Sequence, residues 1–246
     1  MTIKRVLVVD VETDGLDPAT DVVLEVAAVL FDVQHAEVVA SYSALQVASS
    51  NRAQAINGIP ATLVRSVPSV FPDGALPIGD AAFVPMLGFV EHADAYVSHR
   101  ATFDRSFFPA DLANRLPWVC SKFGCDWPRG RFGSHLAHLA IDHGVPVTGA
   151  HRAMGDCMLL AGIMRATHEH YAAYGRDPSG SRAWEVRALP TILEQAIERG
   201  VGNPPRCAHG ADGPEPRQCP NYVRTYLRSP TLRCCPQHGG AAGWVT

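Results

Sequence analysis

Two acids, Asp10 and Glu12, end an apolar run near the N-terminus, in the stretch VLVVDVETDGLDP at residues 6–18. On a strand, side chains two residues apart point to the same face, about 6.6 Å apart along the chain. Two carboxylates placed in this way suit a pair of divalent ions about 3.5–4 Å apart, with one carboxylate shared. Chance alone gives such a pair roughly three or four times in a chain of ordinary composition, so the pair needs further support. Asp14 precedes Gly15, and we interpret it only as a turn residue.

Two later segments add residues that could act with these acids. SHRATFDRSFF, at 98–108, places Asp104 in the first turns of a helix that follows a strand. Asp104 can act together with Asp10 and Glu12 only if that strand lies beside the first one. In HRAMGDC, residues five apart would face different sides of one helix, so we place His151 in a loop and Asp156 in the first turns of the next helix. A histidine in a loop can reach a water molecule, and it changes protonation near neutral pH.

The elements that must position these residues follow from apolar patterning. Strands are predicted at 4–11, 22–31, 37–46, 94–99 and 118–121, and helices at 81–92, from 101, at 133–143, and from just after 151 to about 173. The first strand is apolar on both faces, which indicates a central position, and the next two follow closely as an antiparallel meander. A Pro- and Gly-rich passage separates the third strand from the helices. This order predicts an α/β fold with a mixed sheet flanked by helices.

Taken together, the segments read D-x-E, F-D and H-x-x-x-x-D, and this ordered set resembles the DEDDh (DnaQ-like) family of 3′–5′ exonucleases over about residues 4–172. DVETDGLDP is similar to the first motif of that family, and INGIP takes the place of its HGI segment. SHRATFD is similar to HNAxFD, and AHRAMGDC to AHRAxxDA. Arg100 and Asn57 depart from the family, whose members usually have Asn and often have His at these positions. The departures bear on substrate preference and local geometry.

The resemblance implies a ribonuclease H-like fold and metal-dependent hydrolysis at the 3′ ends of single-stranded nucleic acid, DNA favoured over RNA, with release of nucleoside 5′-monophosphates. By analogy with the family, Asp10, Glu12, Asp104 and Asp156 bind two Mg²⁺ or Mn²⁺ ions, His151 is the general base, and Thr13, Ile56 and Asn57 contact the terminal nucleotide. A metal pair supplies the nucleophile and the charge stabilisation that phosphodiester hydrolysis needs. Without metal, four carboxylates repel one another, so we expect at least one raised pKa.

Other classes of function are less consistent with these residues. A ribonuclease H-like endonuclease or resolvase is disfavoured by the histidine five residues before the last aspartate. A catalytically inactive nucleic-acid-binding or assembly protein is disfavoured because all five catalytic positions are occupied. A nucleotide-binding α/β domain is disfavoured because neither G-x-G-x-x-G nor a P-loop follows the first strand. The choice of DNA or RNA, a role in proofreading, repair, degradation or RNA processing, and a homodimer or a polymerase or replication partner stay open.

Composition sets further limits on the 246 residues, which are 47% hydrophobic and carry a net charge of −3. No stretch approaches the roughly 20 apolar residues of a membrane helix, and the N-terminus is typical of a strand rather than a signal peptide. We therefore expect a cytoplasmic protein without a membrane partner, whose cysteines are thiols or metal ligands. From Arg176 onward nine arginines stand against six acids, which leaves −6 for the first 175 residues. Such an acidic part needs metal ions or a local basic patch to bind nucleic acid.

We divide the chain into an exonuclease domain (1–175), a helical linker (176–205) and a Cys/His-rich C-terminal module (206–246). The module could hold a tetrahedral zinc ion, for which the predicted ligands are Cys207, Cys219, Cys235 and His238, with Cys234 or His209 as substitutes. A segment this short and this poor in apolar residues needs such a metal to fold. The alternative is a disordered tail with incidental thiols. Its five arginines and two acids in 206–240 favour contact with nucleic acid or an acidic partner.

Overall fold

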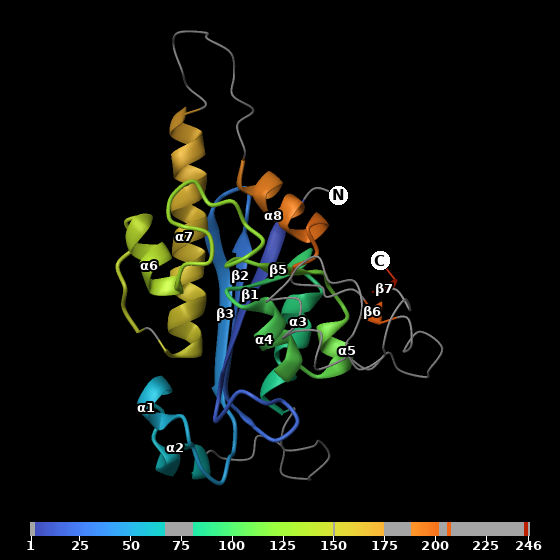
Figure 1. Cartoon of the computed structure of the whole chain (residues 1–246), viewed down its shortest axis with the longest axis vertical. Coiled ribbons are helices and arrows are strands. Elements are labelled where there is room, and N and C mark those ends of the chain that lie inside the picture. The colour runs from blue at the N-terminus through green and yellow to red at the C-terminus, as the bar shows by residue number, and fades with distance from the viewer. Residues whose placement is uncertain are drawn as a thin grey trace.

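A five-stranded mixed sheet forms the centre of the computed structural model, which describes residues 3–66, 81–149, 151–174, 188–201, 206–207 and 244–245 (Figure 1). The strands are β1 (Arg5–Thr13), β2 (Val23–Asp32), β3 (Glu37–Leu45), β4 (Ala95–Ser98) and β5 (Trp118–Cys120), in the order β3-β2-β1-β4-β5. The first three strands are antiparallel, whereas β4 and β5 run parallel to β1. The predicted meander and mixed sheet are both confirmed.

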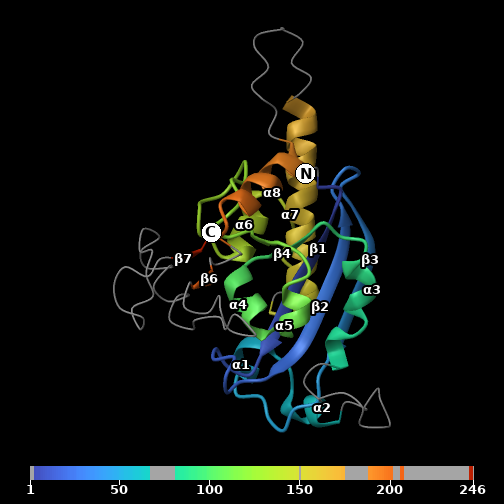
Figure 2. The same ribbon diagram turned by 90° about the vertical axis from the view of Figure 1, so that its right-hand side faces the viewer.

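Helices pack on both faces of this sheet. One face carries α6 (Leu136–Asp142), α7 (Ala153–Tyr174) and α8 (Leu189–Glu198), and the other carries η1 (Ala81–Phe83), α3 (Met86–Val90), α4 (Ala101–Phe107) and α5 (Ala110–Ala113). Two short helices, α1 (Gln54–Asn57) and α2 (Ala61–Arg65), lie beyond one end of the sheet in both views (Figures 1 and 2). The carboxyl end of β1 and the start of α7 lie at this same end (Figure 1).

Alternation along β1 decides where its acids point. Val6 and Val8 pack in the cluster that includes α6, α7 and α8, whereas Leu7, Val9 and Val11 pack in the cluster on the opposite face. Each fully buried aliphatic side chain contributes about 1.5–3 kcal/mol, so these five residues fix the register of the strand. Asp10 and Glu12 continue the even-numbered set, and the fold therefore directs both carboxylates toward α7.

The helices differ from the sequence-based expectation in three places. The predicted helix at 81–92 is divided, because Pro85 separates η1 from α3. The helix predicted at 133–143 begins only at Leu136, since Gly133 has a φ of 77° and Ser134 donates its hydroxyl proton to the carbonyl of Arg131. The passage between β3 and η1, which we expected to be irregular, contains α1 and α2.

The C-terminal part contributes little to the described structure. A two-residue strand, β6 (Arg206–Cys207), pairs antiparallel with β7 (Trp244–Val245). The side chains of the four predicted zinc ligands, Cys207, Cys219, Cys235 and His238, lie outside the described residues, and the domain boundaries at 175 and 205 stay predictions. In the described part of the chain, every helix is too short or too polar to cross a bilayer.

Candidate active site

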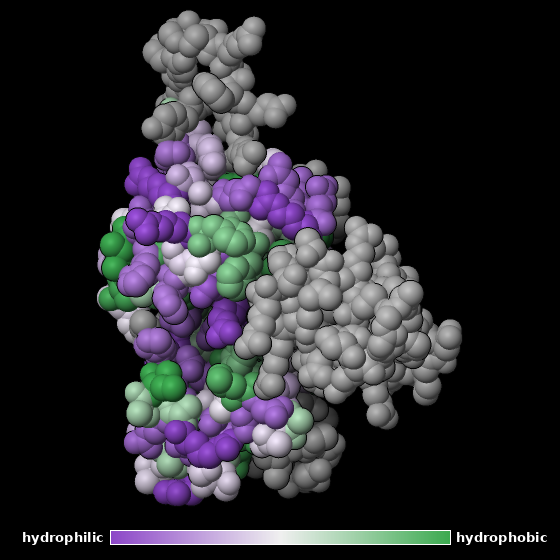
Figure 3. Space-filling view, in the orientation of Figure 1, coloured by the Kyte–Doolittle hydropathy of each residue, from purple (hydrophilic) through white to green (hydrophobic). Residues whose placement is uncertain are grey.

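Three carboxylates converge where β1 meets the start of α7. Asp10 and Glu12 come from the last part of β1, and Asp156 comes from the first turn of α7. One carboxylate oxygen from each residue lies within 4.8 Å of the others, and all three side chains are partly buried. Hydrophilic residues cover the surface at the lower end of α7, and a hydrophobic patch lies directly below them over α1 (Figure 3). The acids thus form a compact group of hard oxygen donors.

Asp104 lies next to this group and is held by the backbone of β1. β4 pairs with β1 in parallel, as the interpretation of Asp104 required, and α4 follows it directly. Asp104 is 2% exposed, and its Oδ1 accepts a hydrogen bond of 3.3 Å from the Val11 amide. Its Oδ2 accepts a hydrogen bond from the Ser98 hydroxyl. The side chain is close enough to Asp10 to raise the pKa of that carboxyl, although it is not part of the three-residue group.

His151 stands in the turn that leads into α7, as predicted. Its φ is 63°, in the left-handed region, and its side chain is exposed. The backbone amide of His151 donates to Oδ1 of Asp156 over 3.3 Å. Gly155 allows this turn to pack closely on the helix, because a Cβ at that position would lie 1.9 Å from the carbonyl oxygen of Gly149. Backbone contacts therefore place the histidine beside the last aspartate.

The electrostatics of the site agree with mutual repulsion among buried acids. Burial, followed by the charges of Asp156 and Glu25, raises the pKa of Glu12 from 4.5 to about 8. Burial and the charges of Asp104 and Asp156 raise the pKa of Asp10 well above its ordinary value. Burial also raises the pKa of Asp104 to about 6 and that of Asp156 above its ordinary value. The expectation of at least one raised pKa is confirmed.

Glu25, which sequence reasoning did not single out, ties β2 to the start of α7. It pairs in register with Glu12 and is 3% exposed. Arg152 donates to both of its oxygens, from Nε to Oε2 over 2.9 Å and from Nη2 to Oε1 over 2.7 Å. The amide of Ala153 donates to Oε2 over 3.0 Å. Glu25 thus fixes the two residues that follow His151.

The three residues predicted to contact the terminal nucleotide differ in their accessibility. Ile56 is 69% exposed, whereas Thr13 is largely buried and its hydroxyl donates to the carbonyl of Gly15. Asn57 is 2% exposed, and its amide is used internally: Nδ2 donates to the Thr13 carbonyl over 3.3 Å, and Oδ1 accepts from Asn51 and Ile59. Asn57 therefore holds α1 against the end of β1, and its contact with the terminal nucleotide stays a prediction.

Asp14 has a larger role than that of a simple turn residue. Its Oδ1 accepts from the Val22 amide over 2.8 Å, and its Oδ2 pairs with Arg52 over 3.1 Å. Arg52 also pairs with Asp21, and the hydrogen bond from the Asp17 amide, followed by this ion pair, lowers the pKa of Asp21 to about 2. Asp14 therefore stabilises the loop between β1 and β2 and stays outside the acid group.

Other positioning residues were missed for identifiable reasons. Glu25 could have been recognised from the sequence, because it is the one acid inside the apolar run VVLEVAAVLF at 22–31. Ser98 could not have been recognised in this way, since a serine at the end of a strand is common. Gly155 shows its function only when the backbone of Gly149 is seen against it.

The donor set fits divalent cations of the Mg²⁺ or Mn²⁺ class. Hard cations of this kind take carboxylate oxygens as ligands. The three oxygens within 4.8 Å of one another form such a set. Burial, followed by the neighbouring carboxylates, raises the pKa of Asp10 and Glu12, so a bound cation would favour their ionised forms.

Comparison with known proteins finds two relatives in sequence and a likeness in structure. No protein-family model matches the chain. It is 33% identical over 176 residues to a DNA polymerase III of the PolC type from Thermotoga maritima, covering 64% of this chain and 11% of the polymerase. It is also 33% identical over 129 residues to the PolC-type polymerase of Thermotoga petrophila, covering 50% of this chain and 8% of the polymerase. The chain thus spans about a tenth of the length of these curated relatives.

The structure resembles that of a 3′-exonuclease that recognises the 3′ end of a histone mRNA stem-loop, with a TM-score of 0.52. The two sequences are 12% identical, and the likeness covers 69% of this chain and 84% of that chain. The likeness shows the fold alone: a mixed five-stranded sheet flanked by helices, which is the ribonuclease H-like fold. The predicted fold class is confirmed for the described residues.

Proposed function

We propose that the chain is a metal-dependent 3′–5′ exonuclease of the DEDDh type, which releases nucleoside 5′-monophosphates from single-stranded 3′ ends. One observation carries the proposal: the oxygens of Asp10, Glu12 and Asp156 lie within 4.8 Å of one another at the end of the central strand, in a fold that exonucleases share. Asp104 and His151 lie on the elements directly beside them. These contacts support a joint role for the five residues that the motifs predicted.

The carboxylates of Asp10, Glu12, Asp104 and Asp156 would hold two Mg²⁺ or Mn²⁺ ions. Such ions, when bound, make hydroxide available at neutral pH and stabilise charge on the attacking and leaving oxygens. The Val11 amide and the Ser98 hydroxyl orient the Asp104 carboxylate, and each of its oxygens keeps a lone pair for a further partner.

His151 would accept the proton of the attacking water while the new P–O bond forms and the bond from phosphorus to O3′ of the preceding nucleotide breaks. The exposed imidazole in the turn before α7 can reach a water beside the acids. Glu25 acts as a positioning residue, since it holds Arg152 and Ala153 and thereby the turn that carries the histidine.

The terminal nucleotide would lie against the end of β1. Ile56 offers an exposed apolar surface for a base, and Thr13 offers the backbone at the strand end. Asn57 keeps these two residues together through its hydrogen bond to the Thr13 carbonyl. We propose DNA as the substrate class because the sequence relatives are PolC-type DNA polymerases. A cytoplasmic location and a homodimer or polymerase partner stay predictions.

The test compares matched DNA and RNA oligonucleotides, single- and double-stranded and labelled at the 5′ end, in Mg²⁺ and in EDTA. We expect stepwise shortening of single-stranded DNA in Mg²⁺ alone, and its loss in Asp10→Asn. Asp142→Asn, which changes an exposed carboxylate on α6, serves as the matched control and keeps the activity. His151→Ala should slow hydrolysis far more than it weakens Mg²⁺ binding. Full activity in Asp10→Asn, or cleavage of circular DNA, would contradict the proposal.

A further inference from the structure

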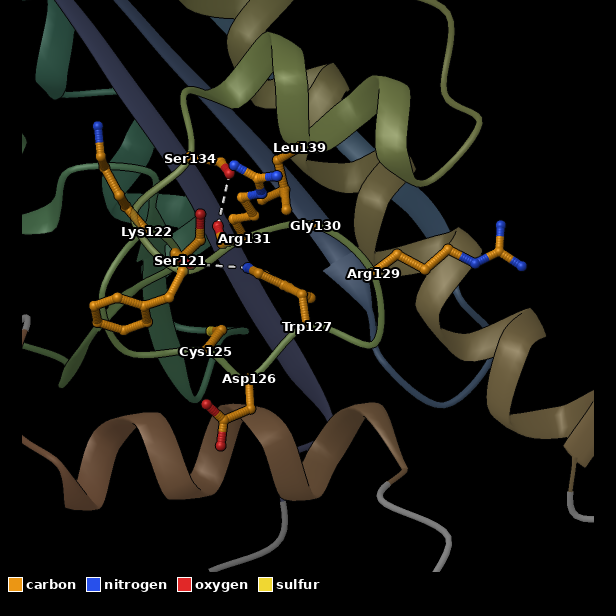
Figure 4. A pocket seen from close by; sticks show the side chains of 11 residues that line it. Ser121, Lys122, Cys125, Asp126, Trp127, Arg129, Gly130, Arg131, Ser134 and Leu139 are labelled. Carbon is orange, nitrogen blue, oxygen red and sulfur yellow. Dashed lines mark hydrogen bonds between the residues drawn. The ribbon is translucent and has the colours of Figure 1, made fainter.

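A basic surface lies on the loop between β5 and α6 and at the start of α4. We define it by Arg100, Lys122, Arg129 and Arg131; the three arginines are exposed and the lysine is half-buried. Lys122, Arg129 and Arg131 line a pocket of about 160 Å³, together with Asp126 as an acid. Asp126 is paired with Arg199 of the α8 region, and Arg131 lies next to Ser134 and Leu139 (Figure 4). The formal charge around the pocket is therefore positive.

His99 connects both ends of this loop to the active site. Its ring nitrogens contact the hydroxyl of Ser121 over 2.9 Å and the carbonyl of Ser134 over 3.0 Å. The carbonyl can only accept, so Nε2 donates to it, and in the neutral ring Nδ1 then accepts from the Ser121 hydroxyl. Burial, followed by the charge of Lys122, lowers the pKa of His99 to about 4. Because His99 directly follows Ser98, the loop is held one residue away from the hydrogen bond that orients Asp104.

The cations of the basic surface lack acidic partners in the part of the chain that the structure describes. No carboxylate there forms an ion pair with Arg100, Lys122, Arg129 or Arg131. Burial, followed by the charge of Arg100, lowers the pKa of Lys122, so these two cations lie close enough to repel. A polyanion that covers them would remove this repulsion.

Aromatic rings alternate with these cations. The ammonium of Lys122 lies 5.5 Å from the centre of the Phe123 ring, and the guanidinium of Arg100 lies 5.6 Å from that of Phe103. Phe132 is 71% exposed and contacts Phe123 edge to face, with the ring centres 5.8 Å apart. A positive groove with exposed aromatic rings is typical of surfaces that bind single-stranded nucleic acid, because phosphates pair with the cations and bases stack on the rings.

We propose that this surface binds the sugar–phosphate backbone of the substrate strand on the 5′ side of the bond that is cut, and that Phe132 stacks on one of its bases. The inference rests on the proposed function, since it takes the 3′ end to lie at the acids. The strand then passes over the carboxyl ends of β4 and β5, where His99 and Ser121 join the loop to the sheet. The first 175 residues carry a net charge of −6, so a local basic surface is what brings a polyanion to this acidic domain.

The test measures binding of a fluorescent single-stranded DNA of 12 nucleotides to the full chain by anisotropy. The measurements use EDTA, so that no metal-dependent cleavage occurs, and they span a range of salt concentrations. The double variant Lys122→Gln/Arg131→Gln should bind about tenfold more weakly at low salt, and its slope of log affinity against log salt should be smaller by about 1.4, since each phosphate contact contributes about 0.7. For a strand of three nucleotides, the double variant should lose much less affinity relative to the wild-type chain. Phe132→Ala should weaken binding without changing the slope.

The matched control is Lys4→Gln/Arg115→Gln, which removes two exposed cations that lie away from the loop. A salt slope and affinity equal to those of this control would overturn the inference. The proposed function would still stand if the wild-type chain shortens DNA in Mg²⁺. If the wild-type chain does not cleave, but the double variant still loses affinity and slope, then the basic surface stands as a binding site and the proposed function fails.

Discussion

Neutralising Glu12 should stabilise the metal-free protein at high pH while abolishing hydrolysis. Glu12 lies on the sheet face that α7 covers, beside Asp156 and in register with Glu25. Burial and these negative charges raise its pKa from 4.5 in the unfolded chain to about 8 in the folded one. A carboxyl with a raised pKa in the folded state keeps its proton more tightly there, so stability falls as pH rises from about 4.5 to about 8.

The magnitude follows from the same two pKa values. The difference between 4.5 and about 8 corresponds to about 5 kcal/mol at a pH above both, if Glu12 titrates alone. Neighbouring acids take up part of the shared protons, so we expect Glu12→Gln to stabilise the protein by roughly 3 kcal/mol at about pH 9 and by little at about pH 4.5. For a domain of this size, that gain raises the melting temperature by roughly 6–12 °C.

Thermal unfolding in EDTA at several pH values measures the effect. Glu91→Gln is the matched control, because Glu91 is an exposed carboxylate at the end of α3. Mg²⁺ should raise the melting temperature of the wild-type chain, and more at about pH 9 than at about pH 6, whereas Glu12→Gln should gain less. If the metal-free wild-type chain becomes more stable between about pH 6 and about pH 9, or if Glu12→Gln is no more stable than Glu91→Gln there, the argument from repulsion is refuted.

Two further predictions concern the support of the site and the C-terminal module. Glu25→Gln should lower the free energy of unfolding in Mg²⁺ by about 1–2 kcal/mol, since charged hydrogen bonds to half-exposed Arg152 are lost, and should reduce kcat more than it raises KM. A rate equal to that of Glu37→Gln, at the exposed start of β3, would contradict the positioning role. Metal analysis of the full chain should find about one zinc per molecule, and Cys235→Ser should remove it while Cys120→Ser does not. An absence of zinc from the unmodified chain would refute the predicted Cys₃His site.

The sequence predicted the elements that have a strong apolar pattern and missed those that depend on contacts between distant residues. The run from Val6 to Val9 is apolar on both faces, which sufficed to place the central strand. The spacing of His151 and Asp156 placed one in a turn and the other in α7. The internal hydrogen bonds of Asn57 could not be predicted, because the Asn51 side chain and the Ile59 amide that bind its amide oxygen belong to a loop without any periodic pattern.

The five candidate catalytic side chains lie on a strand, on helices and in a turn, which differ in rigidity. This difference matches the roles that we propose for the side chains. Asp10 and Glu12 lie on a strand that is hydrogen-bonded on both sides, and Asp156 lies on a helix whose buried face packs against β1. These acids repel one another, so only a stiff framework keeps them together when no cation is present. His151 alone stands in a turn with an exposed side chain. Metal ligation needs carboxylate oxygens in fixed positions, and the fold places them on a strand and on helices. A general base must approach a water and then release its proton to solvent, and the fold places His151 in an exposed turn.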